Sequence, residues 1–202
     1  MRRILCTQRV DSVPGRAERR DALDQAWSTF LLRCGLLPIP VPNVPEAAEA
    51  LMDQVPFDGV LLTGGNDLAS YGGDAPERDQ VERSLLKRAL DERRPVLGVC
   101  RGMQLLLDAF DTPLVEVPGH VSPRQEIEVD GAPAMVNSYH RWGCREVGGG
   151  LQVWARASDG VVKAVRHPER RLVGIMWHPE RMDPLREEDV ALFREQFSEG
   201  AA

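Results

Sequence analysis

A cysteine lies between two glycines where a short apolar run, residues 95–99, meets the start of a helical pattern. This order of strand, tight turn and helix is that of a nucleophile elbow, with Cys100 in the place of serine. Gly98 and Gly102 suit the turn because a Cβ at either position would collide with neighbouring backbone. The positive end of the following helix would lower the pKa of the thiol. Cys100 is therefore a candidate nucleophile, and the alternative is a buried, unreactive thiol.

A nucleophilic cysteine needs a base, and two of the four histidines begin the same tetrapeptide, His-Pro-Glu-Arg. His178 follows an apolar run, residues 172–177, that predicts a buried strand. Pro179 favours an extended conformation at His178, which would place the Glu180 carboxylate on the same side as the imidazole. Cys100, His178 and Glu180 then form a candidate nucleophile, base and orienting acid.

The other copy of this tetrapeptide begins at His167. It lies between two predicted strands, residues 161–166 and 172–177, and this position indicates a hairpin turn. Adjacent antiparallel strands end at opposite edges of a sheet, so only one of the two histidines can lie beside Cys100. We assign the base to His178 and expect His167 in a solvent-facing turn.

The first half of the chain alternates strand and helix patterns. Strands are expected at residues 4–7, 36–41, 57–63 and 95–100, and helices at 17–34, 45–53, 80–94 and 101–108. The prolines within 36–41 make that run an edge strand, and 74–80 forms a polar loop. After residue 112, short alternating runs predict antiparallel strands. These runs are 113–117, 125–129, 133–137, 151–156, 161–166 and 172–177, and a closing helix is expected at 187–197.

These patterns predict an α/β fold that forms one domain over residues 1–202. We expect a doubly wound, mostly parallel sheet with helices on both faces and added antiparallel strands in the second half. Ligands of such sheets bind outside the carboxyl ends of the strands. Residues 63–65 and Cys100 both follow predicted strands, so they should face one crevice.

The composition is that of an ordinary globular protein, with 43% hydrophobic and 28% charged residues. A net charge of −6 argues against nucleic-acid binding, which usually needs a basic face. The four cysteines include no Cys-x-x-Cys pair, so we expect neither a zinc site nor a disulfide framework. The chain has no run near the ~20 apolar residues of a membrane span and no signal peptide pattern. We expect a cytoplasmic protein that does not bind membranes.

Three segments resemble the class I glutamine amidotransferase-like superfamily: residues 98–104, the double glycine at 64–65, and residues 174–180. In that superfamily, which has a flavodoxin-like fold, a Cys-His-Glu triad cleaves a γ-glutamyl amide through a thioester. Residues 62–72 and 136–140 further resemble its γ-glutamyl hydrolase branch, the peptidase C26-like proteins, which includes γ-glutamyl-γ-aminobutyrate hydrolases. That branch usually works without a synthase partner. Residues 19–27 also resemble the γ-glutamyl-CDP-amidate hydrolases.

The resemblance implies roles for further residues. The backbone N–H groups of Gly65 and Arg101 would form an oxyanion hole. Other residues would bind the glutamyl part of the substrate, namely Gln104, Asn137, Ser138, Tyr139 and His140. His140 is equally compatible with a packed loop histidine. The Arg101 side chain would contact a substrate carboxylate or phosphate, or else form a surface charge. The resemblance implies neither a metal nor a cofactor.

We therefore expect hydrolysis of a γ-glutamyl amide to glutamate and a small or nucleotide-bearing amine, without a partner protein; an oligomer is compatible with the sequence. The leaving amine would lie between loops 8–20 and 66–80. Four arginines in or beside the first loop would suit a phosphorylated leaving group: Arg9, Arg16, Arg19 and Arg20. The last two equally suit a solvated helix start. The alternatives are a glutaminase subunit that donates ammonia to a separate synthetase, and a binding or chaperone-like relative without hydrolytic activity.

Overall fold

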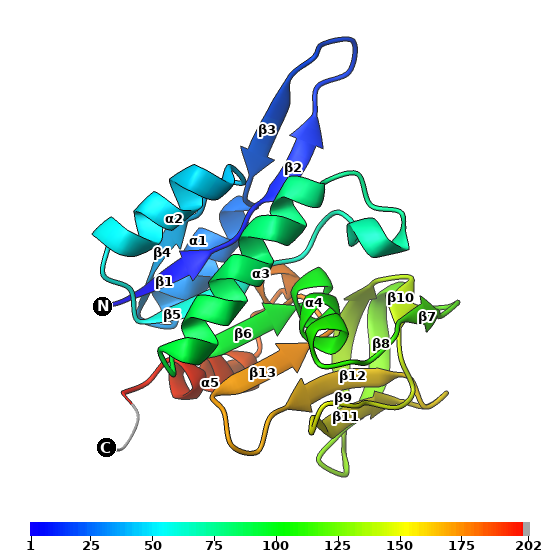
Figure 1. Ribbon diagram of the computed structural model, residues 1–202. Helices are drawn as coiled ribbons and strands as arrows, with labels where there is room; N and C mark the ends of the chain where they lie inside the picture. Colours follow the sequence, from blue (N-terminus) through cyan, green and yellow to red (C-terminus); the bar gives the residue numbers. More distant parts are fainter. Residues whose placement is uncertain (200–202) are drawn as a thin grey trace.

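The structure, a computed structural model, describes residues 1–199, which are built around a mixed nine-stranded sheet (Figure 1). From one edge to the other, its strands are β4 (Leu36–Pro40), β1 (Arg2–Cys6), β5 (Gly59–Leu62), β6 (Val96–Val99), β13 (Leu172–Ile175), β12 (Val162–Arg166), β11 (Gln152–Ala157), β8 (Val121–Val129) and β9 (Ala132–Tyr139). Within the group from β4 to β13, neighbouring strands are parallel to one another. The others are antiparallel. The predicted α/β sheet is thus confirmed.

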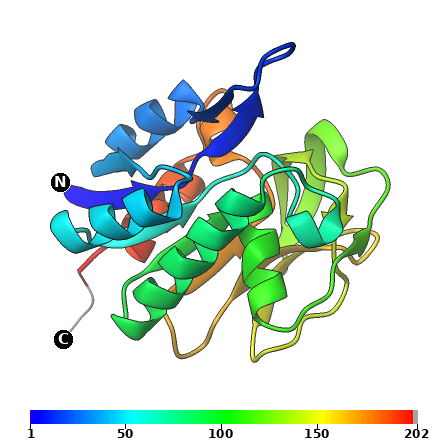
Figure 2. The same ribbon diagram turned by 45° about the horizontal axis from the view of Figure 1, so that its top comes forward.

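Helices cover both faces of the parallel part of the sheet, as expected (Figures 1 and 2). They are α1 (Gln25–Arg33), α2 (Pro45–Gln54), α3 (Pro76–Asp91), α4 (Arg101–Ala109) and α5 (Glu187–Gln196). One core packs α2, α3 and α4 on the sheet, and a second packs α1 and α5 on the opposite face. All residues of β5 and β6 are buried, as is typical of central parallel strands. Within residues 1–199, no helix combines the length and the apolar character needed to cross a membrane.

The predicted helix at 17–34 is wrong over residues 17–24. Instead, β2 (Arg9–Ser12) and β3 (Arg19–Ala22) form a hairpin that projects from the body of the protein (Figure 2). The charged residues of this segment offer no apolar face that a helix could bury. Helix α1 begins only after Asp24, whose carboxylate caps it by accepting a hydrogen bond from the N–H of Ala26 at 3.0 Å.

Other departures are smaller. Part of the predicted loop at 74–80 is helical, because α3 begins at Pro76. Proline suits the first position of a helix, where a backbone N–H would have no partner within the helix. The predicted strand at 113–117 is reduced to β7 (Val115–Glu116), which pairs with β10 (Trp142–Gly143) in a separate two-stranded sheet. Strand β13 is antiparallel to β12 but parallel to β6. The last strand therefore ends at the same sheet edge as Cys100.

The turn between β6 and α4 has the geometry of an elbow. Cys100 is the N-cap of α4 and has φ of 52° and ψ of −107°, a conformation that L-residues rarely adopt. A Cβ on Gly98 would lie 2.6 Å from the backbone of Gly102, and a Cβ on Gly102 would overlap the carbonyl of Leu62. The predicted need for both glycines is confirmed, and it arises because α4 approaches β5 and β6 so closely.

This close approach predicts that Gly102→Ala destabilises the protein by at least about 3 kcal/mol, although alanine favours helices, because the added methyl group overlaps the backbone of Leu62. The measurement is the free energy of unfolding in urea. Gly15→Ala is the matched control: Gly15 has a φ of 72° with no atom close to its Cβ position, so only a backbone cost of about 1–2 kcal/mol is expected. Equal losses for the two variants would contradict the steric explanation.

Candidate functional site

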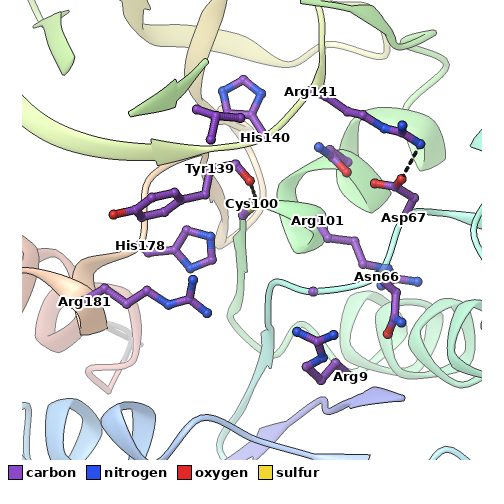
Figure 3. A pocket seen from close by; sticks show the side chains of 13 residues that line it. Arg9, Asn66, Asp67, Cys100, Arg101, Tyr139, His140, Arg141, His178 and Arg181 are labelled. Atoms are coloured by element: carbon purple, nitrogen blue, oxygen red, sulfur yellow. Dashed lines mark hydrogen bonds and ion pairs between the residues drawn. The ribbon is translucent and has the colours of Figure 1, made fainter. Parts of the chain in front are cut away.

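A cavity of about 460 Å³ opens at the carboxyl ends of β5, β6 and β13. Cys100, Gln104 and His178 contribute to its wall, as do Tyr139 and His140 from the segment after β9 (Figure 3). The loop after β5 contributes Gly65. The structure thus brings the expected loop and the elbow to one crevice.

His178 and Glu180 form a buried pair at this cavity. The Nδ1 atom of His178 lies 2.8 Å from Oε1 of Glu180. Because a carboxylate only accepts, Nδ1 carries a hydrogen, and Nε2 is left for the cavity. His178 is extended as expected, but Pro179–Arg181 form a short 3₁₀ helix, η2, that turns Glu180 back toward the ring. The expected contact is present, although a turn and not an extended chain produces it.

Cys100 and His178 are held side by side against the loop after β5. A Cβ added to Gly64 would lie 2.6 Å from Cε1 of His178 and 3.6 Å from Cβ of Cys100. Burial lowers the pKa of His178, but its charge interaction and hydrogen bond with Cys100, together with Glu180, outweigh this and raise the pKa to about 10. The imidazole of His178 is therefore held in its charged form, which places a positive charge beside Cys100.

The amide of Asn137 holds the backbone of His178. Its Oδ1 accepts from the His178 N–H at 2.8 Å, and its Nδ2 donates to the His178 carbonyl at 2.8 Å. The side chains of Asn137 and Ser138 are buried behind the cavity, whereas Tyr139 and His140 line it. The Asn137 side chain therefore positions His178, while the expected binding of substrate by the 137–139 backbone stays a prediction.

His167 lies in the turn between β12 and β13, as predicted. That turn is at the sheet edge where β6 begins, and Cys100 follows the other end of β6. The His167 ring is half-buried and not fully solvent-facing, because it packs on Phe110 with ring centroids 5.5 Å apart.

Both interpretations of the Arg101 side chain are wrong. The side chain is buried and does not reach the cavity mouth or the surface, because its guanidinium is ion-paired with Asp79 and Glu82 of α3. Glu82 also pairs with Arg78 at 2.9 Å, with both side chains fully buried. Burial raises the pKa of Glu82, but Arg101 and Arg78 more than offset this and lower it. These four residues, here termed the ion cluster, tie α3 to the elbow.

Arg78 also holds the loop after β5. Its guanidinium donates to the carbonyls of Thr63 at 2.8 Å, Gly64 at 3.0 Å and Gly65 at 2.5 Å. The carbonyl of Gly64 and the N–H of Gly65 belong to one planar trans peptide and point in opposite directions. Since Arg78 holds the carbonyl, the Gly65 N–H faces away from Arg78. The N–H of Arg101, in the first turn of α4, has no carbonyl partner within the helix.

Arg78, Asp79 and Glu82 were not anticipated from the sequence. A signal was present, since Arg78 and Glu82 continue the helical spacing of Leu85 and Ala89, which are buried. Charged residues that occupy core positions of a helix must find buried partners.

A protein-family model matches most of this chain. The family model for peptidase C26 matches residues 5–117 and 124–180, which include Cys100, His178 and Glu180. The chain belongs to the peptidase C26 family. This confirms the resemblance to the γ-glutamyl hydrolase branch, and it assigns the chain to a family of hydrolases.

Two relatives of this peptidase C26 chain carry specific names. A γ-glutamyl-CDP-amidate hydrolase of Campylobacter jejuni is 30% identical over 69% of this chain and 69% of its own length. A γ-glutamyl-γ-aminobutyrate hydrolase of Escherichia coli O157:H7 is 27% identical over 88% of this chain and 84% of its own. The glutaminase domain of Trypanosoma brucei CTPS, solved with bound acivicin, superposes with a TM-score of 0.70 at 14% identity, covering 100% of this chain and 96% of that domain. This last similarity shows the shared fold.

Besides Arg101, three arginines line the cavity of this family member. Arg9 begins β2, while Arg141 and Arg181 lie on opposite sides of the cavity, with Arg141 paired to Asp67 at 2.8 Å (Figure 3). Arg141 and Arg181 were not anticipated from the sequence. Of the four arginines that were, only Arg9 lines the cavity. The other three pair elsewhere: Arg16 and Arg20 with Glu18, and Arg19 with Glu77.

Residues 1–199 contain no group of three or more His, Cys, Asp or Glu side chains arranged to hold a metal ion. The cavity instead gathers a thiol, an imidazole and guanidinium groups. Such a site suits a substrate whose carbonyl carbon the thiol can attack and whose negatively charged groups the arginines can bind.

The four cysteines are expected to differ sharply in reactivity. Burial raises the pKa of Cys6 and Cys34 to about 12 and that of Cys144 to about 11, whereas Cys100 lines the cavity beside His178. We predict that iodoacetamide at pH 7 labels Cys100 at least tenfold faster than the other three, as measured by mass spectrometry of tryptic peptides. Comparable labelling of Cys144 would contradict this.

Proposed function

We propose that this protein hydrolyses γ-glutamyl amides with Cys100 as nucleophile, His178 as acid and base, and Glu180 as the group that orients His178. The observation that carries the proposal is the hydrogen bond between His178 Nδ1 and Glu180 Oε1 at 2.8 Å. This bond leaves the other ring nitrogen, Nε2, available to the elbow cysteine. Membership in peptidase C26 supports the reaction class.

In the first half of the reaction, the Cys100 thiolate attacks the γ-carbonyl carbon and the carbonyl electrons move to oxygen. The N–H groups of Gly65 and Arg101 would stabilise this oxyanion: both residues line the cavity, and the Arg101 N–H has no carbonyl partner within α4. The C–N bond then breaks, and the amine leaves with the proton that His178 carries on Nε2. A γ-glutamyl thioester remains on Cys100.

In the second half, neutral His178 takes a proton from water, and the resulting hydroxide attacks the thioester carbonyl. The C–S bond breaks, glutamate leaves, and the thiolate and imidazolium are restored. Gln104, buried at the cavity wall with its amide donating to the Trp142 carbonyl at 3.0 Å, is positioned to contact the glutamyl group.

The leaving amine of the proposed substrate carries negative charge. Arg9, Arg141 and Arg181 line the cavity, and although each also pairs with a carboxylate, Asp67 is the only acidic residue among those that line it. The names of two relatives specify γ-glutamyl compounds, which supports the same substrate class here. We propose that the protein acts alone and releases the amine, in preference to the ammonia-donating alternative.

The two His-Pro-Glu-Arg copies give a matched pair of variants. His178→Ala should lower kcat by at least about 10³-fold, because the acid–base step alone contributes ~10²–10⁴-fold. His167→Ala should keep activity within about twofold, since it lies at the opposite sheet edge. The kcat of Glu180→Gln should lie between those of the two histidine variants, because it disturbs the orientation of His178 without removing it. The measurement is glutamate release from γ-glutamyl-γ-aminobutyrate, and Cys100→Ala gives the background rate. Loss of activity in His167→Ala alone would overturn the assignment.

Arg9 and Arg16 separate the proposed charge contact from general charge effects. Arg9→Gln should raise KM for a γ-glutamyl nucleotide about tenfold, because one charge-assisted hydrogen bond contributes about 1.5–3 kcal/mol. It should change KM for neutral γ-glutamylmethylamide less than threefold. Arg16→Gln, at the hairpin tip, should change neither. Steady-state kinetics with glutamine as a third substrate test the alternative: rapid glutamine hydrolysis with no turnover of larger amides would favour the ammonia-donating subunit.

A further inference from the structure

Lys163 is a buried cation behind the candidate site. It lies in β12 with 1% of its surface exposed, between Val162 and Ala164, which are also buried. Among residues 1–199, no carboxylate lies within ion-pairing distance of its ammonium. A buried charge without a counter-charge is costly. None of the roles expected for the site explains why a lysine lies here.

The ammonium of Lys163 is bound by two residues of one segment. It donates to Oγ of Ser138 at 2.9 Å and to Nε2 of His140 at 2.7 Å. His140 can accept because its Nδ1 carries the ring hydrogen and donates to the Trp142 carbonyl at 2.9 Å. Burial and then Lys163 lower the pKa of His140 to about 3, so His140 stays neutral and Lys163 is the charged member of this pair.

These two contacts place Lys163 behind the nucleophile. Ser138 and His140 flank Tyr139, whose carbonyl oxygen lies 4.0 Å from Sγ of Cys100 and can accept a weak hydrogen bond from its thiol form. Lys163 therefore holds the segment on both sides of this carbonyl. Two negative groups act on the ammonium without contacting it: the Asp159 carboxylate and, across the segment, the Cys100 thiolate.

Among the other charged and titratable groups around Lys163, Asp159 raises the pKa of Lys163 more than Cys100 does, and Asp159 shares its charge with two further groups. Asp159, in the turn before β12, is 43% exposed and interacts with Arg145 at 3.7 Å and with Nε2 of His120 at 3.1 Å. His120 stacks on His140 with ring centroids 5.1 Å apart. His178 lies across the cavity with its own partner, Glu180.

We propose that Lys163 is a positioning residue for the nucleophile: it fixes residues 138–140 against Cys100 and supplies the positive charge that stabilises the Cys100 thiolate from behind that segment. This inference rests on the proposed role of Cys100. In a site of low polarity a nearby cation favours the anionic form of a thiol. Burial lowers the pKa of Lys163 to about 7, while Asp159 and Cys100 act to raise it. The stabilising charge is therefore present at acidic pH, half lost at about pH 7 and absent at alkaline pH.

The test measures the rate of Cys100 alkylation by iodoacetamide from pH 5 to 10, without substrate. Lys163→Met should slow alkylation about tenfold at pH 6.5 and raise the apparent pKa of the thiol by about one unit, with rates converging above pH 9.5. Lys163→Arg, which keeps the charge, should stay within about threefold of wild type. Lys87→Met removes the chain's other lysine, on the exposed face of α3, and is the control expected to change nothing.

An unchanged alkylation profile in a folded Lys163→Met protein would overturn the proposal. A second measurement uses the wild-type chain. The two lysines permit NMR titration of ¹³C-labelled lysine, and capping Cys100 with iodoacetamide should lower the pKa of Lys163 by about one unit, because the coupling is reciprocal. An unchanged pKa of Lys163 would also overturn the proposal. Neither readout depends on turnover, so failure to hydrolyse γ-glutamyl amides would be distinguishable from failure of this inference.

Discussion

The buried ion cluster of Arg78, Asp79, Glu82 and Arg101 is the interaction on which the site depends. It joins α3 to the first residue of α4, and through Arg78 it also binds three successive carbonyls of the loop after β5. Removing one partner would leave a buried charge uncompensated, at a cost of about 3–5 kcal/mol. The elbow and the glycine loop are therefore held in one relative position by charges that no solvent can screen.

This cluster determines which backbone groups face the cavity. Carbonyls that bind Arg78 are withdrawn from the site, and the amides of the same peptides are turned the other way. On the His178 side of the cavity, the Asn137 amide donates to the His178 carbonyl and accepts from the His178 N–H. The reactive side chains are thus positioned through backbone contacts from buried residues. Such positioning costs no side-chain entropy at the moment of reaction, which is the basis of preorganised electrostatics.

Local patterns in the sequence predicted the sheet, the elbow and the pairing of His178 with Glu180, because each depends on residues within a few positions of one another. The ion cluster depends on contacts between α3 and α4, so Arg101 was expected in solvent or at the substrate. Periodicity gave a partial signal for Arg78, and a single lysine in the apolar run around Lys163 was a similar one. The arginine-rich hairpin was mistaken for a helix, since charged residues carry little periodic information.

The β2–β3 hairpin has a consequence for how this enzyme family can diversify. The hairpin projects from the body (Figure 1) and is anchored at its base, where the Val10 backbone bonds the Asn66 amide and Asp21 accepts from Asn43; it also brings Arg9 to the cavity beside Gly65. The tip beyond these anchors is mostly exposed, and surface substitutions usually change stability little. Substitutions in this arm can therefore change the charge beside the cavity while Cys100, His178 and Glu180 keep their positions.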